Sequence, residues 1–242
     1  MPHLAVLSTA MVLSAGYGRR MRPLSTTTPK PLIEVAGKAL IDHCLDGLAA
    51  AGIEKAVVNV HYMADLVEAH LGRRRAPKTV VSDERAKLLD TGGGCLKALP
   101  LLGEGPFLLR NCDSFWLEGV RPNLDWLISG WNDEEMDGLL LLASTVASAG
   151  YWGTGDFMLG KDGRLTRRAE RTVAPFAYAG AAILSPRLFR DPPGEVFSLN
   201  ALFDRALEEG RLFGVQLDGL WINVENPEAV KAAEMAILES AA

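Results

Sequence analysis

The chain has 242 residues, of which 48% are hydrophobic and 23% charged, and its formal net charge is −5. This composition excludes a disordered chain and fits one compact α/β domain with a large core. No extended basic stripe is present, which argues against nucleic acid as a partner. The odd cysteine count of three fits neither a disulfide framework nor a CxxC metal site, so we expect a reducing, cytoplasmic setting.

The first third of the chain alternates strand-like and helix-like patterns. The apolar run 4–13 is too short to span a bilayer and lacks a basic leader, so we predict a strand at 9–13 and no membrane association. Apolar residues then recur at helical spacing twice, and Gly52 ends the first of these helices. The predicted elements are a helix over 41–48, a strand at 56–60, a helix over 63–71 and a strand at 79–81. This order predicts a mostly parallel sheet with ligands at the carboxyl ends of its strands.

The stretch 15–32, AGYGRRMRPLSTTTPKPL, follows the first strand and joins a Gly-x-Gly loop to two cations. Gly16 and Gly18 let the backbone turn without a Cβ, so that main-chain N–H groups can face phosphate oxygens. Arg20 would offer a planar fork to two oxygens, and Lys30 a mobile point charge. Such turns also occur after strands without any ligand, but this context predicts a triphosphate site.

Two familiar phosphate loops do not fit this stretch. A dinucleotide fingerprint needs a third glycine, where this chain has Met21, and an acidic residue ending the second strand, where it has Asn59 and His61. A Walker loop needs its lysine within the turn, whereas Lys30 lies twelve residues after Gly18. The sequence therefore predicts a phosphate loop of a different type.

The segment 90–113 carries the next group of candidates. DTGGG is expected to form a glycine turn that enters a short helix, either pressing backbone against a base or sugar or serving only as a tight helix entry. A buried strand at 106–109 then ends in RNCD, so that Asp113 projects from the tip of a central strand. A lone Asp is more often a turn residue or a helix cap, but beside a phosphate loop it predicts a Mg²⁺ ligand.

From residue 139 onward the pattern becomes antiparallel, which is typical of a substrate lid or platform. The predicted strands are 139–143, 157–159, 165–168 and 178–184, with a turn at 161–163. The chain closes with a helix over 199–209, a strand at 220–224 and a helix from 227 to about 238. Since no linker or repeat interrupts these elements, we predict one domain with two unequal lobes.

Four segments together resemble the sugar-1-phosphate nucleotidyltransferases. They are LSAGYGRRMRPLSTTTPKPL at 13–32, DTGGGCLKALPLLGEGPFLLRNCDSFW at 90–116, GDF at 155–157 and WINVENPEAV at 221–230. They span nearly the whole chain in family order, and the first is highly specific. Within the family, the chain most resembles the bacterial N-acetylmuramate-1-phosphate uridylyltransferases of cell-wall recycling, with the mannose-1-phosphate guanylyltransferases close behind.

The resemblance implies a Rossmann-like nucleotide-diphospho-sugar transferase fold, with a mixed, mostly parallel central sheet, helices on both faces and a small antiparallel substrate lobe. The single domain 1–242 would comprise a nucleotide-binding part at about 1–135, a sugar-binding part at about 136–225 and a C-terminal helix at 227–240. The implied reaction joins UTP and a sugar 1-phosphate into a UDP-sugar and releases pyrophosphate. A phosphate oxygen attacks the α-phosphorus in line, so that catalysis is chiefly alignment and charge neutralisation.

The resemblance also implies roles for single residues. The implied catalytic residues are Arg20 and Lys30, which hold the triphosphate, and Asp113, which binds the cofactor Mg²⁺. The implied nucleotide contacts are Ala15, Gly16, Gly18, Arg20, Lys30, Thr91, Gly92 and Gly93. The sugar-binding candidates are Trp152, Asp156, Glu170 and Gly180, where Trp152 is either a stacking ring or a packing residue.

Near its C-terminus the chain departs from the family pattern Trp-x-Asp-Val-Gly-Thr, because it has Asn223 and Glu225 in place of the Asp and the Gly. Asn223 offers an amide oxygen to the metal but removes one negative charge. Glu225 lies two residues further and shares its strand face, so it is a further metal candidate that restores the charge, or else a solvated strand end. Cys112 replaces the family's usual glycine before the metal Asp, which narrows the allowed backbone angles.

Three functions are therefore compared. The leading one is the uridylyltransferase, and the second is a guanylyltransferase that uses GTP and mannose 1-phosphate. The third, prompted by Asn223, is a catalytically weak nucleotide-sugar binding or regulatory protein, against which the retained Arg20, Lys30 and Asp113 speak. The expected partners are a nucleoside triphosphate and a sugar 1-phosphate, with no nucleic acid and no membrane. The sequence is compatible with both a monomer and a dimer.

Overall fold

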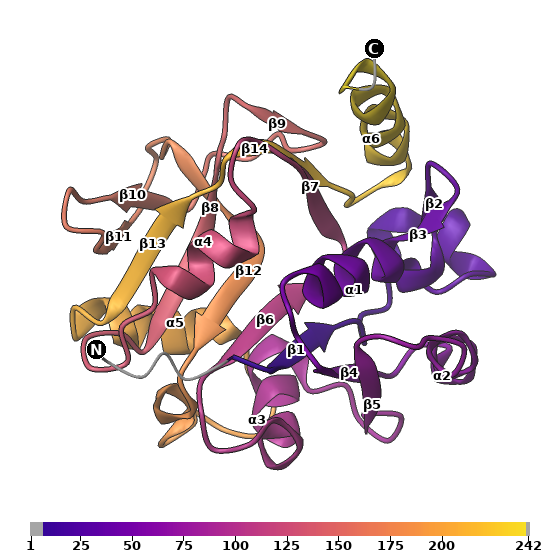
Figure 1. Ribbon diagram of the computed structural model, residues 1–242, viewed down its shortest axis with the longest axis horizontal. Helices are drawn as coiled ribbons and strands as arrows, with labels where there is room; N and C mark the ends of the chain where they lie inside the picture. Colours follow the sequence, from indigo (N-terminus) through magenta and orange to yellow (C-terminus); the bar gives the residue numbers. More distant parts are fainter. Residues whose placement is uncertain (1–6, 241–242) are drawn as a thin grey trace.

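The computed structural model describes residues 7–240, and a mixed β-sheet with helices on both faces forms its centre (Figure 1). The nine strands of this sheet are β1 (Thr9–Leu13), β4 (Lys55–Val60), β5 (Lys78–Asp83), β6 (Phe107–Asn111), β8 (Gly138–Ser144), β10 (Phe157–Leu159), β11 (Leu165–Arg167), β12 (Phe176–Leu184) and β13 (Leu212–Gln216). Their order is β11-β10-β12-β6-β1-β4-β5, and β8 and β13 continue the sheet from β12. The predicted fold class is thus confirmed.

The parallel core of the sheet sets where loops meet. β1 runs parallel to both β4 and β6, with Val12 opposite Val58 on one side and Arg110 on the other. β12 runs against its neighbours β6 and β8. Because parallel strands end at the same edge of a sheet, the segments that follow β1, β4 and β6 come together there.

Helices cover both faces of the sheet because the strands alternate their side chains between two apolar layers. Met11 and Val57 pack on one face, whereas Ala10, Val12 and Val58 pack on the other. The first of these layers contains residues of α3 (Asp90–Leu102) and α5 (Leu199–Glu208). The second contains residues of α1 (Leu40–Ala50), α2 (Ala64–Leu71) and α4 (Asn123–Ser129) (Figure 1).

A smaller three-stranded sheet carries the end of the chain back to the edge where the loops meet. It consists of β7 (Ser114–Glu118), β14 (Gly219–Asn223) and β9 (Ser148–Ala149), in the order β7-β14-β9. The hairpin β2 (Glu34–Val35) and β3 (Lys38–Ala39) lies near α6 (Pro227–Ser240), which stands apart from the main sheet in Figure 1. A third apolar cluster, including Met21, Phe115, Ile222 and Ala233, fills the space between these parts.

One prediction about local structure needs correction, and one strand was missed. DTGGG is not a turn before a helix but the first turns of α3 itself, which begins at Asp90. β13 was not predicted, because the short run LFGVQ has a glycine at its centre and no clear alternation. Residues 4–6 of the predicted N-terminal run lie outside the described residues.

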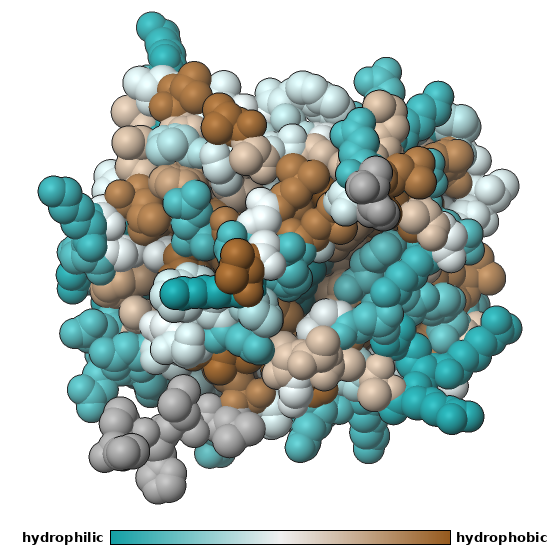
Figure 2. Space-filling model, turned by 45° about the horizontal axis from the view of Figure 1, so that its top comes forward, coloured by the Kyte–Doolittle hydropathy of each residue, from teal (hydrophilic) through white to brown (hydrophobic). Residues whose placement is uncertain are grey.

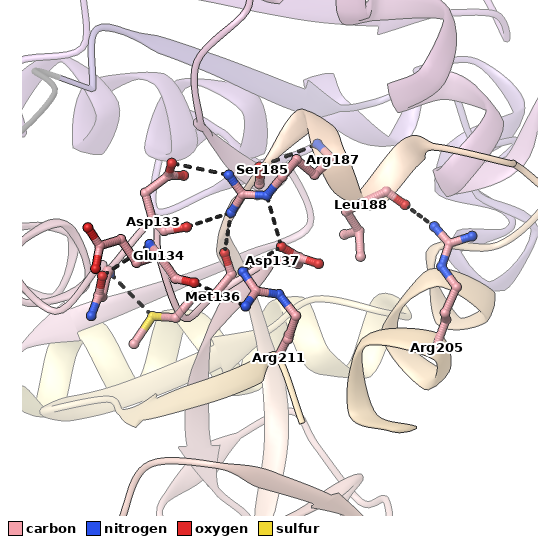
Figure 3. A network of polar contacts seen from close by, with 10 residues as sticks. Asp133, Glu134, Met136, Asp137, Ser185, Arg187, Leu188, Arg205 and Arg211 are labelled. Carbon is pink, nitrogen blue, oxygen red and sulfur yellow. Dashed lines mark hydrogen bonds and ion pairs between the residues drawn. The ribbon is translucent and has the colours of Figure 1, made fainter. Parts of the chain in front are cut away.

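At the N-terminal end of β8, ion pairs with two arginines connect the strand to neighbouring segments (Figure 3). These arginines lie far from the phosphate loop in the sequence. Arg187 lies in the short 3-10 helix η4 (Pro186–Phe189) and pairs with Asp133 and Asp137. Arg211, just before β13, pairs with the same Asp137 and donates to the carbonyl of Glu134. Both guanidinium groups have acidic or carbonyl partners within this network. The network therefore has a structural role, which is to join η4 and the start of β13 to the segment before β8.

Candidate active site

The loop after β1 forms one wall of a cavity of about 620 Å³ at the edge where the parallel strands end. Gly18 has a φ of 61°, and a Cβ there would lie 2.9 Å from Cβ of Lys30. Both its backbone conformation and its close contact therefore require glycine. A Cβ on Gly16 would meet no atom within 4 Å, so this residue leaves open space above the backbone. Ser25 Oγ donates to the Gly18 carbonyl at 2.7 Å and holds the turn.

The two predicted cations each face a carboxylate across this cavity. Lys30 begins the 3-10 helix η3 (Lys30–Leu32), and its Nζ lies 2.7 Å from Oδ2 of Asp113. The Lys30 side chain is 12% exposed and that of Asp113 is 31% exposed. Arg20 pairs with Glu225, and here the exposed fractions are 70% and 34%. The inner pair is therefore better shielded from water and more strongly coupled than the outer one.

Main-chain pairing brings the C-terminal segment to Asp113. Asn223 at the end of β14 lies opposite Ser114 of β7, and the next N–H, that of Val224, donates to the Asp113 carbonyl at 2.9 Å. The Asn223 side chain is buried, and its Nδ2 donates to Oε1 of Glu225 at 2.9 Å. The two side chains thus contact each other as neighbours, although β14 ends at Asn223 and Glu225 does not lie on the strand as expected. Their role as metal ligands stays a prediction.

The donors present are of the kind that Mg²⁺ takes when it is shared with a nucleotide. Within residues 7–240, no three His, Cys, Asp or Glu side chains gather into a protein-only metal cage. Mg²⁺ in such enzymes is usually held by one or two carboxylates plus phosphate oxygens. Asp113 and Glu225 line the same cavity, and Asn223 contacts Glu225. The residue set, with two carboxylates and one amide, therefore fits Mg²⁺.

Cys112 fits its place beside Asp113 without backbone strain. It belongs to the two-residue turn between β6 and β7, and it is not among the described residues with positive φ. Its side chain is 5% exposed, and burial raises the pKa of its thiol well above the ordinary value. The thiol therefore stays neutral beside the carboxylate, and the glycine of the family pattern is not needed here.

The first turns of α3 both line the cavity and pack against the segment before α5. The N–H groups of Gly92 and Gly93 both donate to the Phe197 carbonyl, at 2.9 and 3.2 Å. A Cβ on Gly92 would lie 2.3 Å from the Phe197 ring, and one on Gly93 would lie 2.2 Å from the Glu195 carbonyl oxygen. Only Asp90 and Thr91 of this segment line the cavity.

The structure brings most of the predicted nucleotide contacts together around the cavity. Its lining includes Ala15, Gly16, Gly18, Arg20, Lys30, Thr91, Asp113 and Glu225, whereas Gly92 and Gly93 are buried behind it. It also includes Tyr17, Asn59 and Asn111, for which sequence reasoning assigned no role. These three residues lie in or beside the carboxyl ends of β1, β4 and β6, and this position in the sequence could have identified them as candidates for ligand contact.

The four predicted sugar contacts lie outside the lining of this cavity. Oδ2 of Asp156 accepts from the Tyr178 N–H at 2.9 Å, so this carboxylate supports β12. Gly180 has a φ of 78° and packs so closely that a Cβ would lie 2.4 Å from Ser114 Oγ. Trp152 is 70% exposed, and Glu170 is also exposed. Their roles toward a sugar stay predictions.

The face in Figure 2 mixes hydrophilic and hydrophobic residues over its whole extent. Individual apolar side chains do reach the surface, among them Val146, Trp152 and Val173. Within residues 7–240, no helix has the length and apolar character needed to cross a membrane.

Comparisons with known proteins agree with this geometry. A family model described as nucleotidyl transferase matches residues 9–108. The N-acetylmuramate alpha-1-phosphate uridylyltransferase of Caulobacter vibrioides is 50% identical over 235 residues, which are 96% of this chain and 97% of that protein. A mannose-1-phosphate guanylyltransferase catalytic subunit beta from Danio rerio is 28% identical over 228 residues, covering 90% of this chain and 61% of that protein. A solved UDP-glucose pyrophosphorylase in complex with UDP-glucose shares the fold, with a TM-score of 0.77 at 17% identity, covering 97% of this chain and 99% of that one.

Proposed function

The chain belongs to the nucleotidyl transferase family, and from this premise we propose that it is a uridylyltransferase that joins UTP and N-acetylmuramate 1-phosphate into UDP-N-acetylmuramate and pyrophosphate. The observation that carries the proposal is the identity of half its residues, over nearly the full length of both chains, to a relative of that name. The guanylyltransferase alternative is weaker, because the relative of that name is more distant and considerably longer than this chain.

The geometry supports a transfer that needs no general base. A phosphate oxygen of the sugar 1-phosphate is already ionised and attacks the α-phosphorus of UTP, so that one P–O bond forms as the bond to pyrophosphate breaks. The backbone N–H groups of the loop 14–20 would cradle the phosphates, and Lys30 and Arg20 would neutralise their charge. These cations would then exchange their present carboxylate partners for phosphate oxygens.

Mg²⁺ is the proposed cofactor, with Asp113 as its main ligand and Asn223 and Glu225 beside it. Bound there, it would neutralise charge on the triphosphate and help to orient it. Glu225 would return the negative charge that Asn223 lacks, and the hydrogen bond between the two side chains supports this proposal because it makes them neighbours. Arg20, paired with Glu225 in the described state, would be released toward the phosphates.

The setting of the reaction follows from the same relatives and from the cysteines. We place the enzyme in peptidoglycan recycling and nucleotide-sugar biosynthesis, as the substrate proposal implies. Cys44, Cys95 and Cys112 are all buried and free, which supports a reducing cytoplasm. A monomer and a dimer both stay compatible with the proposal.

A pyrophosphate-release assay tests the proposal with a matrix of substrates. UTP, GTP, CTP and dTTP would each be combined with the 1-phosphates of N-acetylmuramate, N-acetylglucosamine, glucose and mannose. We expect the highest kcat/KM for UTP with N-acetylmuramate 1-phosphate, and the variant Asp113→Asn supplies the background rate. A maximum for GTP with mannose 1-phosphate would reassign the enzyme. Nucleotide binding without turnover for any pair would favour the regulatory alternative.

A further inference from the structure

A buried carboxylate lies behind the nucleotide cavity, and no part of the proposed chemistry uses it. Glu84 follows β5 directly and is 1% exposed. Its Oε1 accepts from Nδ2 of Asn59 at 2.8 Å, and its Oε2 accepts from the Leu89 N–H at 3.1 Å. Neither donor is charged, so this carboxylate is stabilised by hydrogen bonds to neutral groups. Burial of a charge without an oppositely charged partner costs free energy of folding. A functional role for Glu84 would explain why the chain keeps it.

The hydrogen bonds continue from Asn59 to the phosphate loop. Oδ1 of Asn59 accepts from the Ser14 N–H at 2.7 Å, and Ser14 Oγ donates to the Asn59 carbonyl. A single chain of contacts thus runs from Ser14, at the start of the loop 14–20, through two side chains to Leu89, just before α3. Ser14 and Asn59 line the cavity, as do Leu88, Asp90 and Thr91 around Leu89.

The direction of every hydrogen bond in this chain is fixed. The main-chain N–H groups of Ser14 and Leu89 can only donate, so the two side chains between them must accept at both outer ends. Asn59 accepts from Ser14 and therefore must donate toward Glu84. That leaves residue 84 with two donors to satisfy, and only a carboxylate offers two acceptor oxygens and no donor.

Helix α3 is shaped to approach this pair. A Cβ on Gly94 would lie 2.8 Å from Oε1 of Glu84 and 2.9 Å from Nδ2 of Asn59. Glycine at this position lets the helix backbone pass directly over the hydrogen-bonded side chains. The pair is therefore enclosed by β4, β5 and α3, and water has little access to it.

We propose that Glu84 is a positioning residue for nucleotide binding, which acts through Asn59 and Leu89 to hold the phosphate loop and the start of α3 at a fixed separation. It touches no reacting atom. The inference rests on the proposed function only in taking the cavity as the nucleoside triphosphate site, and it does not depend on which base or sugar is used.

A swap of charge between the two side chains tests this assignment. In Glu84→Gln, the single carboxamide oxygen cannot satisfy both donors, and in Asn59→Asp, two carboxylates face each other across a hydrogen-bond distance. In the double variant, the carboxylate now at position 59 accepts from the Ser14 N–H and from the carboxamide now at position 84. The oxygen of that carboxamide accepts from the Leu89 N–H, so every group is satisfied again, with one charge as before. Glu104→Gln, at an exposed glutamate, is the matched control.

The readouts are the Kd for the nucleoside triphosphate that the wild-type protein binds most tightly, the KM for each substrate, and amide hydrogen exchange without ligand. We expect each single variant to weaken nucleotide binding about tenfold, with the KM for the sugar 1-phosphate nearly unchanged, and the double variant to recover most of the loss. Exchange should speed up in both 13–20 and 86–95 in the single variants and slow again in the double one.

The outcomes separate this inference from the proposed function. If the protein binds GTP in place of UTP, the proposed function fails while the swap still tests Glu84 with GTP. If it binds no nucleotide, the exchange pattern in 13–20 and 86–95 decides. An unchanged Kd with unchanged exchange in Glu84→Gln would overturn the inference. Loss of thermal stability with no change in KM, or a double variant as impaired as the sum of its parts, would reduce Glu84 to a packing role.

Discussion

The nucleotide side and the sugar side of this molecule are built in different ways. On the nucleotide side, Gly18, Lys30 and Asp113 are fixed by positive φ, close contact and a 2.7 Å ion pair at the ends of parallel strands. On the sugar side, Trp152 and Glu170 stand exposed on the connections between short strands. The predicted phosphate contacts are thus fixed by the frame of the sheet, whereas two of the four predicted sugar contacts, Trp152 and Glu170, are side chains that the frame does not constrain.

Removal of the Asp113 charge should produce the largest loss and would show how far the nucleotide side depends on it. We expect Asp113→Asn to lower kcat/KM by at least about a hundredfold, because it removes the proposed main metal ligand and the partner of Lys30. The free energy of unfolding should fall by only about 1 kcal/mol, since the pair is partly exposed. Steady-state kinetics and urea unfolding measure both. Asp125→Asn, at an exposed site on α4, is the control. An equal loss of kcat/KM in this control would contradict the special role of Asp113 on the nucleotide side.

A methyl group at Gly93 should disturb the frame itself. Its Cβ would lie 2.2 Å from the Glu195 carbonyl oxygen, so we expect Gly93→Ala to destabilise the fold by about 2–3 kcal/mol and to raise the KM for the nucleotide. Gly47→Ala on α1 is a matched control, because a Cβ there meets nothing within 4 Å and alanine favours helices. Thermal unfolding compares the two, and equal melting temperatures would contradict the packing role of Gly93.

Changes at the C-terminal segment should have intermediate effects, confined to the metal dependence. We expect Glu225→Ala to raise the Mg²⁺ concentration for half-maximal activity about threefold to tenfold, and Asn223→Asp to lower it. Kinetics against Mg²⁺ concentration gives both values, with Glu228→Gln on the exposed start of α6 as the control. If Glu225→Ala leaves the metal dependence unchanged, the compensation of charge is wrong.

Truncation of Trp152 should leave stability and nucleotide binding nearly unchanged and should sharpen the contrast from the predicted sugar side. Because the ring is 70% exposed, we expect Trp152→Ala to leave stability within about 0.5 kcal/mol of the parent. If the ring stacks on the sugar, the KM for the sugar 1-phosphate should rise about threefold to tenfold while the KM for the nucleotide stays constant. Trp126→Ala, another exposed tryptophan, serves as the control. Equal KM values for parent and variant would assign Trp152 to the surface.

The sequence predicted the nucleotide side well for a physical reason. A glycine loop, a spaced lysine and an aspartate at a strand tip are local patterns, and parallel strands bring them together without further information. The strands β1, β4 and β6 and the helix α1 were predicted close to their observed bounds. Residue 113 was correctly placed at the tip of a central strand.

What the sequence did not predict depends on contacts between distant segments. The glycines of α3 suggested a turn, but they are helical, and these positions require glycine because Phe197 and Glu195 occupy the space that a side chain would take. The hydrogen bond between Glu84 and Asn59 was not predicted, because the two residues are 25 positions apart and no local sequence pattern connects them. The ion pair between Arg20 and Glu225 joins residues 205 positions apart. Such contacts follow from the sheet order, which a single sequence does not display.

The hydrogen bond from Val224 to Asp113 has a consequence for synthesis on the ribosome. The phosphate loop, Lys30 and Asp113 all lie in the first half of the chain, and β1, β4, β5 and β6, which pair with one another, have all emerged by residue 111. The opposite wall, from β14 to Glu225, emerges more than a hundred residues after Asp113. A nascent chain can therefore form the phosphate loop well before it gains the segment that faces it across the cavity, so the two walls are completed at different stages of synthesis.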